Sequence, residues 1–383
     1  MPSSTSSSSH AGSPEPLAKR LTAADRPGVA QPVPERPVPD LPWGKMLLAA
    51  TALALLLCGG WEWYWRDYGV TPSFRDDSAL WAIQRRQVDT TGQDATVLLA
   101  SSRTYFDVQL PVWERLSGRR PIQLAVVGTS PLFALEDLAD DQKFHGRVLV
   151  GVAPELFFMG YEYHGGGQWL KYLKRESPSD RVGKWLSMHL IEPYVAFYDN
   201  DFALFTVIKR QGWPLRPGRK ASTNVRKLGN TEADRNNRMW SKLETDPDYR
   251  ALARRIWDQD FHDPPPTPAK AAENKQTLDK QIARAVAAVA KLRARGVPVV
   301  FLREPSVDQY LAYEQRVFPR EATWDVLLAE TGAPGIHFQD YPQLQGYTLP
   351  EWSHMTGAEA DRFTAALYAL IDSRYGRPQG VRW

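Results

Sequence analysis

Apolar residues follow two alternating patterns along this chain. Short consecutive runs, partly β-branched, predict buried strands at 96–100, 122–127, 148–152, 297–302 and 336–338. Apolar residues at helical spacing predict helices at 76–88, 106–116, 132–138, 270–295, 323–331 and 356–372. Because strands and helices alternate, we expect right-handed crossover connections and a parallel sheet covered by helices.

The alternation stops between about residue 160 and residue 270, and we interpret this stretch as a helical insertion. Without the insertion, the pattern is typical of a flavodoxin-like three-layer α/β/α sandwich. The insertion carries large apolar side chains, namely Trp185, Leu186, Ile191, Tyr194, Phe197 and Phe205. We expect this stretch to pack as a lid on the sheet; the alternative is a position in a membrane interface.

The N-terminal region changes character at residue 43. Residues 1–42 are rich in Ser, Pro and Ala without periodicity, so we expect a disordered cytoplasmic tail. Residues 43–65 are apolar, flanked by tryptophans and preceded or opened by Lys19, Arg20, Arg26, Arg36 and Lys45. This predicts one transmembrane helix in an inner membrane, with residues 66–383 in the periplasm. A cleaved signal peptide or a lipoprotein at Cys58 are the alternatives, but small residues suited to cleavage are missing.

Composition narrows the classes of partner. The formal net charge is only +3, which does not suggest nucleic-acid binding. Cys58 is the single cysteine, so neither an intramolecular disulfide nor a cysteine-based zinc cluster can form. No glycine-rich phosphate loop and no metal-ligand spacing occurs, and we expect no cofactor and no metal.

Residues suited to acyl transfer occur at both ends of the predicted sheet domain. Ser102 follows the first strand, where the start of the next helix exposes its hydroxyl beside backbone N–H groups. Glu351 lies three residues before His354, just ahead of the last predicted helix. Such a carboxylate can hold imidazole in the tautomer that accepts a proton from serine. Alternatively, Ser102 only caps a helix and Glu351 is a solvated loop acid.

This order of motifs resembles the SGNH/GDSL hydrolase superfamily, which has a serine block after the first strand and an Asp-x-x-His block near the C-terminus. The resemblance implies that Ser102 is the nucleophile, His354 the base and Glu351 its orienting acid. It also implies an oxyanion hole formed by the N–H groups of Ser102 and Gly128. The family's Gly-x-Asn-Asp block is replaced here by 151–155, which contains no asparagine.

The resemblance makes the chain similar to membrane-anchored envelope acyltransferases and esterases. We therefore expect a serine esterase or O-acyltransferase whose substrate is an acylated carbohydrate or lipid, with an exported or envelope glycan as the most concrete case. The alternative is a non-catalytic scaffold that binds a glycan or an envelope protein partner.

Three further charged residues follow predicted strands and are candidates for substrate contact: Arg103, Glu155 and Arg303. Arg103 either pairs with Glu155 across the strand ends or meets an anionic substrate, and Arg303 has the same two alternatives. Asp340 is the fallback for the role of Glu351.

Overall fold

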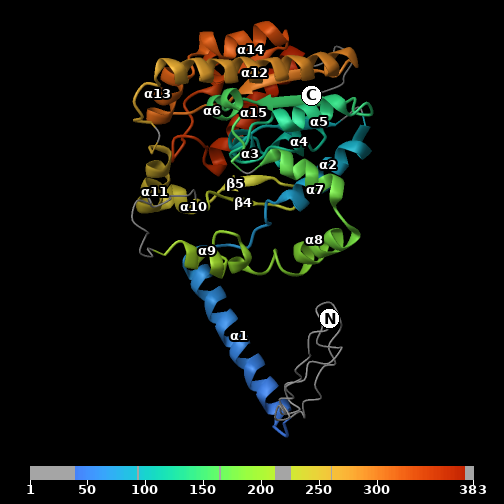
Figure 1. Ribbon diagram of the computed structural model, residues 1–383, viewed down its shortest axis with the longest axis vertical. Coiled ribbons are helices and arrows are strands. Elements are labelled where there is room, and N and C mark those ends of the chain that lie inside the picture. The colour runs from blue at the N-terminus through green and yellow to red at the C-terminus, as the bar shows by residue number, and fades with distance from the viewer. Residues whose placement is uncertain (1–38, 93–94, 164, 212–225, 260, 376–383) are drawn as a thin grey trace, which may run out of the picture. The chain divides into compact units, whose positions relative to one another are not determined.

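The computed structural model describes residues 39–92, 95–163, 165–211, 226–259 and 261–375 (Figure 1). The chain divides into two units, residues 1–57 and residues 58–383. Most of the tail expected at 1–42 falls on 1–38, outside the described residues, and residues 39–42 are exposed and not helical.

The long N-terminal helix α1 (Trp43–Asp67) begins where the sequence predicts and extends two residues past the expected end at 65. By length and composition, α1 is long and apolar enough to cross a membrane. Its leucines from Leu47 to Leu57 are exposed in the first unit. A helix that is apolar on all sides is suited to a nonpolar surrounding rather than to water.

The second unit is built on a five-stranded sheet with the order β2-β1-β3-β6-β7. All neighbouring strands are parallel. The strands are β1 (Thr96–Leu99), β2 (Ile122–Gln123), β3 (Arg147–Gly151), β6 (Val299–Arg303) and β7 (Gly335–His337). The parallel sheet confirms the prediction of an α/β fold, and it brings the carboxyl ends of all five strands to one edge.

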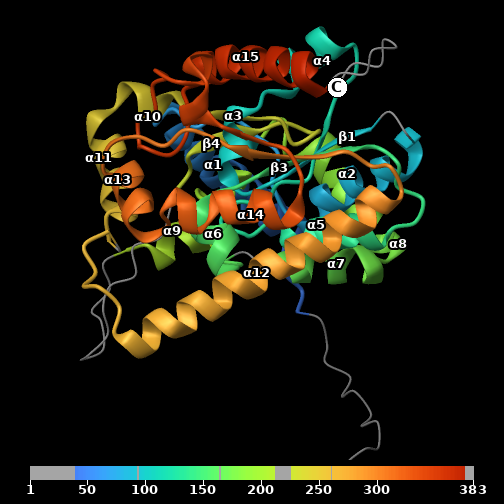
Figure 2. The same cartoon turned by 90° about the horizontal axis from the view of Figure 1, so that it is seen from above.

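Alternate strand residues face two separate apolar cores, which is why β1, β3 and β6 are mainly apolar. The run expected as a strand at 122–127 forms a strand only at 122–123. Val97, Val148 and Phe301 belong to the first core, whereas Leu98 and Leu149 belong to the second. The first core is covered by α2 (Ser78–Thr91), α5 (Leu132–Asp140), α6 (Pro154–Met159), α12 (Pro268–Ala294), α13 (Asp308–Val317) and α14 (Trp324–Thr331). The second is covered by α4 (Leu110–Ser117) and α15 (Gly357–Tyr375), on the opposite side of the sheet (Figure 2).

The segment expected as one helix at 106–116 forms two helices, α3 (Ser102–Asp107) and α4. Gln109 is extended, with φ −91° and ψ 113°. Pro111 has no N–H to donate to the carbonyl of Asp107, so a continuous helix cannot form there. The break leaves α3 as a short helix directly attached to β1.

The segment between α6 and α12 contains strands as well as the expected helices. Its helical elements are α7 (Gly166–Arg175), α8 (Pro178–Leu190), η4 (Ala196–Tyr198), α9 (Leu204–Lys209), α10 (Ser241–Thr245) and α11 (Pro247–Trp257). An antiparallel pair, β4 (Gly229–Thr231) and β5 (Asn237–Met239), was not predicted. A third apolar cluster joins Phe202 and Trp240 of this segment to Ala100 and Phe106, beside the end of β1.

The remaining turns between β6 and α15 are short 3-10 helices. They are η5 (Arg320–Ala322), η6 (Phe338–Asp340) and η7 (Pro342–Leu344). The first joins α13 to α14, and η6 and η7 carry the chain from the edge strand β7 towards the loop that holds Glu351 and His354.

Candidate active site

Ser102 is the first residue of α3 and lies at the carboxyl end of β1, as its sequence position predicts. Ser101, in extended conformation, occupies the N-cap and makes no side-chain cap hydrogen bond. Ser101 is buried, whereas Ser102 is partly exposed. Ser102 and Phe106 are four residues apart in α3 and therefore share one face of that helix.

Glu351 and His354 form a buried pair in the loop before α15. The Nδ1 atom of His354 lies 2.9 Å from Oε1 of Glu351, and the backbone N–H of His354 donates to the same oxygen at 2.6 Å. Neither side chain is more than 1% exposed. Glu351 is thus not a solvated loop acid, and its carboxylate orients the imidazole.

The second oxygen of Glu351 is held by the segment expected as an insertion. Trp257, the last residue of α11, donates its indole N–H to Oε2 of Glu351 at 2.6 Å. Both carboxylate oxygens are therefore engaged, which fixes the plane of the carboxylate against the imidazole.

The other imidazole nitrogen of His354 is available. Its Nε2 atom is buried and has no hydrogen-bond partner among the described residues. Because Nδ1 faces a carboxylate, we assign the proton to Nδ1, which leaves Nε2 as a proton acceptor. The ring stacks on Phe106 with centroids 4.5 Å apart. Since Phe106 lies one turn after Ser102, the base is held against the helix that Ser102 begins, although no hydrogen bond joins the two side chains.

Gly128 lies in the turn after β2, next to the end of β1. The backbone N–H of Val126 donates to the carbonyl of Ala100 at 2.9 Å, which extends the β1–β2 pairing to this point. Gly128 has φ +60°, a conformation that glycine adopts without strain. Its carbonyl accepts from Tyr163 at 3.0 Å. The structure thus places Gly128 and Ser102 after neighbouring strands.

Arg103 and Arg303 are buried side chains that share the carboxylate of Glu314, a partner that the sequence did not predict. Nη2 of Arg103 lies 2.8 Å from one oxygen of Glu314, and Nη2 of Arg303 lies 2.6 Å from the other. Arg103 also donates to Ser353 at 3.2 Å, next to His354. Their exposed fractions are 2% and 4%, so both cations neutralise Glu314 in the interior.

The charged groups of this cluster shift one another's pKa values. Burial alone would lower the pKa of Arg103, but Glu314 outweighs it and raises that pKa. Burial and the like charge of Arg103 lower the pKa of Arg303 to about 10, even though Glu314 opposes this. The carboxyl of Glu314 is itself buried, yet the two arginines lower its pKa.

Two more buried carboxyl groups lie beside α3. Asp107 accepts from the backbone N–H of Met355 at 2.9 Å, and burial raises its pKa well above the usual range. Glu304 accepts from the hydroxyl of Thr104, and burial likewise raises its pKa. A Cβ atom at Gly151 would overlap Thr104 and lie 2.7 Å from both Ala100 and the Glu304 carboxylate. Glycine at 151 therefore permits this close packing.

Two other candidate residues from the sequence, Glu155 and Asp340, are not part of the Glu351–His354 pair. Glu155 is in the first turn of α6 and is partly exposed. Asp340 forms a two-point ion pair with Arg320, at 2.6 and 2.9 Å, so it is not the acid that orients His354. Among the described residues, no group of three His, Cys, Asp or Glu side chains is arranged to hold a metal ion.

Trp257 and Glu314 are the site residues that sequence reasoning missed. Trp257 is far along the chain from Glu351, and Glu314 is far from Arg103 although it lies only 11 residues after Arg303. Glu314 shows one local signal, a glutamate on the inward face of a helix that follows Arg303. Trp257 shows none, because a tryptophan at a helix end is usually an apolar core residue.

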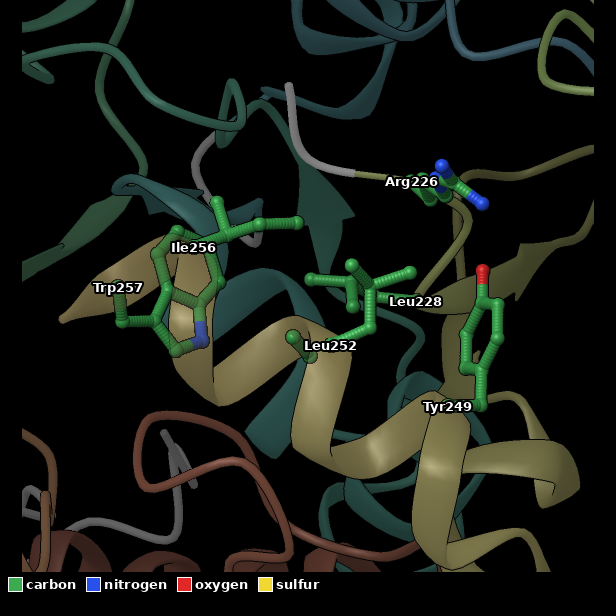
Figure 3. Close-up of a pocket in the computed structure, with 7 residues that line it drawn as sticks. Arg226, Leu228, Tyr249, Leu252, Ile256 and Trp257 are labelled. Carbon is green, nitrogen blue, oxygen red and sulfur yellow. The ribbon is translucent and has the colours of Figure 1, made fainter. Parts of the chain in front are cut away.

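A small apolar cavity adjoins Trp257 (Figure 3). It is lined mainly by residues of α11 and the loop before β4, namely Arg226, Leu228, Tyr249, Leu252, Ala253, Ile256 and Trp257. Figure 3 shows Trp257 and Tyr249 at opposite ends of this lining, with Leu228 and Leu252 between them. Neither Ser102 nor His354 lines it, and the imidazole is closed off from solvent. Trp257 therefore lines the cavity and also contacts the Glu351–His354 pair through its bond to Glu351.

Comparison with protein-family models gives no matching family, and comparison with curated proteins gives no significant match.

Proposed function

We propose that this protein is a membrane-anchored, SGNH-like serine esterase or O-acyltransferase that acts on an envelope or exported glycan. One observation carries the proposal. His354 is oriented by Glu351 through Nδ1, its buried Nε2 has no hydrogen-bond partner among the described residues, and its ring contacts Phe106, which lies one helical turn after Ser102. A buried imidazole nitrogen without a partner is costly, so its retention favours a chemical role.

The reaction follows from these positions. Nε2 of His354 accepts the hydroxyl proton of Ser102 while Oγ attacks the carbonyl carbon of an ester. The N–H groups of Ser102 and Gly128 stabilise the resulting oxyanion. As the carbonyl re-forms, the ester C–O bond breaks, and the leaving alcohol takes the proton from His354. Water or a sugar hydroxyl then attacks the carbonyl carbon of the acyl-serine and gives its proton to His354. The bond between the acyl carbon and Oγ of Ser102 breaks, and His354 returns that proton to Oγ.

The finer architecture belongs to the same proposal. The strand order, with a crossover on each side of β1, and the two covered sheet faces support a flavodoxin-like three-layer sandwich. The apolar helix α1 supports a single-pass anchor, and the basic residues before it support a cytoplasmic N-terminus with the second unit in the periplasm. A glycan substrate is inferred from the resemblance to envelope acyltransferases.

A non-catalytic scaffold is the competing function, and one observation favours it. Ser102 and His354 are not hydrogen bonded, and the imidazole is only 1% exposed. A scaffold would retain the Glu351–His354 pair only to stabilise the loop before α15.

Labelling with a fluorophosphonate probe tests the proposal, because such probes react covalently with activated serines. The full chain in lipid nanodiscs is treated with the probe, alongside Ser102→Ala and Ser101→Ala. Labelling of the wild type and of Ser101→Ala, with loss in Ser102→Ala, is expected. Absence of labelling in folded wild-type protein, or equal labelling of Ser102→Ala, overturns the proposed nucleophile and favours the scaffold.

A further inference from the structure

Helix α8 presents its apolar side to the outside. Its large apolar residues recur at helical spacing on one face, and they are exposed: Val182 by 57%, Trp185 by 55%, Leu186 by 41% and Leu190 by 62%. A surface helix of a globular protein normally turns this face towards the core. The expectation that the aromatic stretch packs as a lid on the sheet is therefore wrong for α8.

Polar contacts on the inner side hold α8 in this orientation. Lys184 is 7% exposed, and its ammonium donates to Glu192 at 3.1 Å and to the backbone carbonyl of Arg75 at 3.1 Å. Ser187 donates to the same carboxylate of Glu192 at 2.7 Å. Glu192 is 1% exposed. Because these charged groups are satisfied inside, rotating α8 to bury its apolar face would leave them unpaired.

Large apolar side chains are also exposed in the segment that follows α8 and in α9. We define the α8–α9 surface as the exposed apolar side chains of Val182, Trp185, Leu186, Leu190, Ile191, Tyr194, Leu204 and Phe205. Phe205 is 76% exposed, the largest fraction in this set. Figure 1 shows α8 and α9 along the same side of the second unit. A large amount of exposed apolar side-chain surface on one side of a unit is typical of an interaction site.

The last turns of α1, from residue 58 on, belong to the second unit and contact the chain between α8 and α9. The carboxylate of Glu62, in the last turns of α1, accepts from the backbone N–H groups of Ala196 at 2.9 Å and Phe197 at 3.1 Å. Arg66 donates to the carbonyl of Tyr194 at 2.8 Å. These bonds fix the end of α1 against the chain between α8 and α9.

We propose that the α8–α9 surface lies in the interfacial layer of the bilayer that α1 crosses, on the side of the second unit. This inference rests on the proposed membrane anchor, not on the proposed chemistry. The surface is continuous with the end of the anchor, and tethering gives it a high effective concentration at the lipid. Trp185 and Tyr194 are the side-chain types that favour membrane interfaces, and α8 has the two-sided character of an interfacial helix.

Depth-dependent quenching of single labels in the full chain tests this surface. In a Cys58→Ser background, Leu190→Cys and Phe205→Cys carry an environment-sensitive fluorophore in phosphatidylethanolamine–phosphatidylglycerol vesicles. Leu53→Cys in α1 reports insertion of the anchor. Val317→Cys, an exposed apolar position of α13 with 45% exposure, is the matched control. The quenchers are lipids with a nitroxide near the headgroup for the labels at 190, 205 and 317, lipids with a nitroxide deep in the acyl chain for the label at 53, and aqueous iodide.

We expect labels at 190 and 205 to lose fluorescence with the nitroxide lipids and to resist iodide, while the label at 317 shows the reverse. If the label at 53 is quenched by lipid but those at 190 and 205 are quenched by iodide, the α8–α9 surface faces water. The inference about this surface is then wrong, while the proposed membrane anchor stands. If 190 and 205 resist both quenchers, another protein surface or a second copy covers them, which also overturns it. If the label at 53 is not quenched by lipid, α1 does not insert into the bilayer, and the proposed membrane anchor is wrong.

Discussion

At the scale of single residues, the carboxylate of Glu351 determines what His354 can do. One oxygen faces Nδ1 and the backbone N–H of His354, and the other accepts from Trp257. An amide at this position could offer its N–H to Nδ1, which would favour the opposite tautomer and remove the acceptor at Nε2. In the proposed reaction, the charge of Glu351 would also stabilise the imidazolium that forms when Ser102 loses its proton.

Glu351→Gln tests this role directly. Because the wrong tautomer blocks proton transfer, we expect the rate of fluorophosphonate labelling to fall by about 10⁴-fold, as for the acid of a serine triad. The measurement is the labelling rate of the purified full chain, and Glu359→Gln in α15 is the control. A rate within a few-fold of wild type would contradict the assignment of Glu351.

Trp257→Phe tests whether the segment between α6 and α12 supports the pair. The substitution keeps an aromatic ring but removes the only donor to Oε2 of Glu351 among the described residues. Hydrogen bonds to charged groups contribute roughly 1.5–3 kcal/mol, so we expect labelling to slow by about tenfold or more. Trp240→Phe removes an indole N–H that donates to Gly69 instead, and it is the matched control. An equal loss in both variants, or a parallel fall in thermal stability, would indicate general destabilisation.

Sequence reasoning could identify Ser102, Glu351 and His354 because each carries a local signal. Ser102 follows a β-branched run, and the acid and base are three residues apart. Trp257 is separated from Glu351 by 94 residues. No periodicity or spacing links two such positions, so only the folded chain reveals their contact.

At the scale of elements, one ion-pair cluster connects α3, β6 and α13. Glu314 of α13 lies between Arg103 of α3 and Arg303 of β6, and Ser306 donates to it at 2.6 Å. Arg103 continues from this cluster to Ser353, beside His354. The cluster thus fixes α3, which begins with Ser102, relative to the loop that carries the base.

Glu314→Gln tests that connection. Removing the carboxylate leaves two buried cations facing each other, so we expect a loss of about 3–5 kcal/mol in the free energy of unfolding at neutral pH. Since the folded state lowers the pKa of Glu314, its contribution is present above the unfolded pKa and is lost as pH falls through the folded pKa. The difference between wild type and variant should therefore shrink on acidification.

Chemical denaturation of the full chain in detergent from neutral to acidic pH measures this difference. Glu330→Gln, at an exposed position of α14, is the control and should change little. A constant difference across that range would show that the carboxylate charge is not what stabilises the cluster.

The elements themselves were largely predictable where burial is uniform. The central strands β1, β3 and β6 are mainly apolar, and α12 lies within two residues of its expected bounds. The failures have local causes. Pro111 divides one expected helix into α3 and α4, and the pair β4–β5 is too short to show a strand pattern. The apolar stripe of α8 indicated a helix correctly but not its orientation, which the buried Lys184–Glu192 pair sets.

At the scale of the whole molecule, the placement of charge along the chain predicts which way α1 is inserted. Five basic residues, Lys19, Arg20, Arg26, Arg36 and Lys45, precede or open the apolar segment without an equal set directly after it. Basic residues near a membrane segment are retained on the cytoplasmic side. In the proposed topology the second unit is exported, to the side where an acyl acceptor on an envelope glycan would be found.

Protease access to intact spheroplasts tests this topology, with epitope tags at the N-terminus and the C-terminus of the full chain. We expect external protease to remove the C-terminal tag and leave the N-terminal tag on a fragment that contains α1. Replacing all five basic residues by glutamine should reduce this asymmetry, because orientation depends on the difference in positive charge across the segment. Protection of the C-terminal tag would place the second unit in the cytoplasm. An N-terminal tag missing from the mature chain before protease is added would instead show that the apolar segment is a cleaved signal.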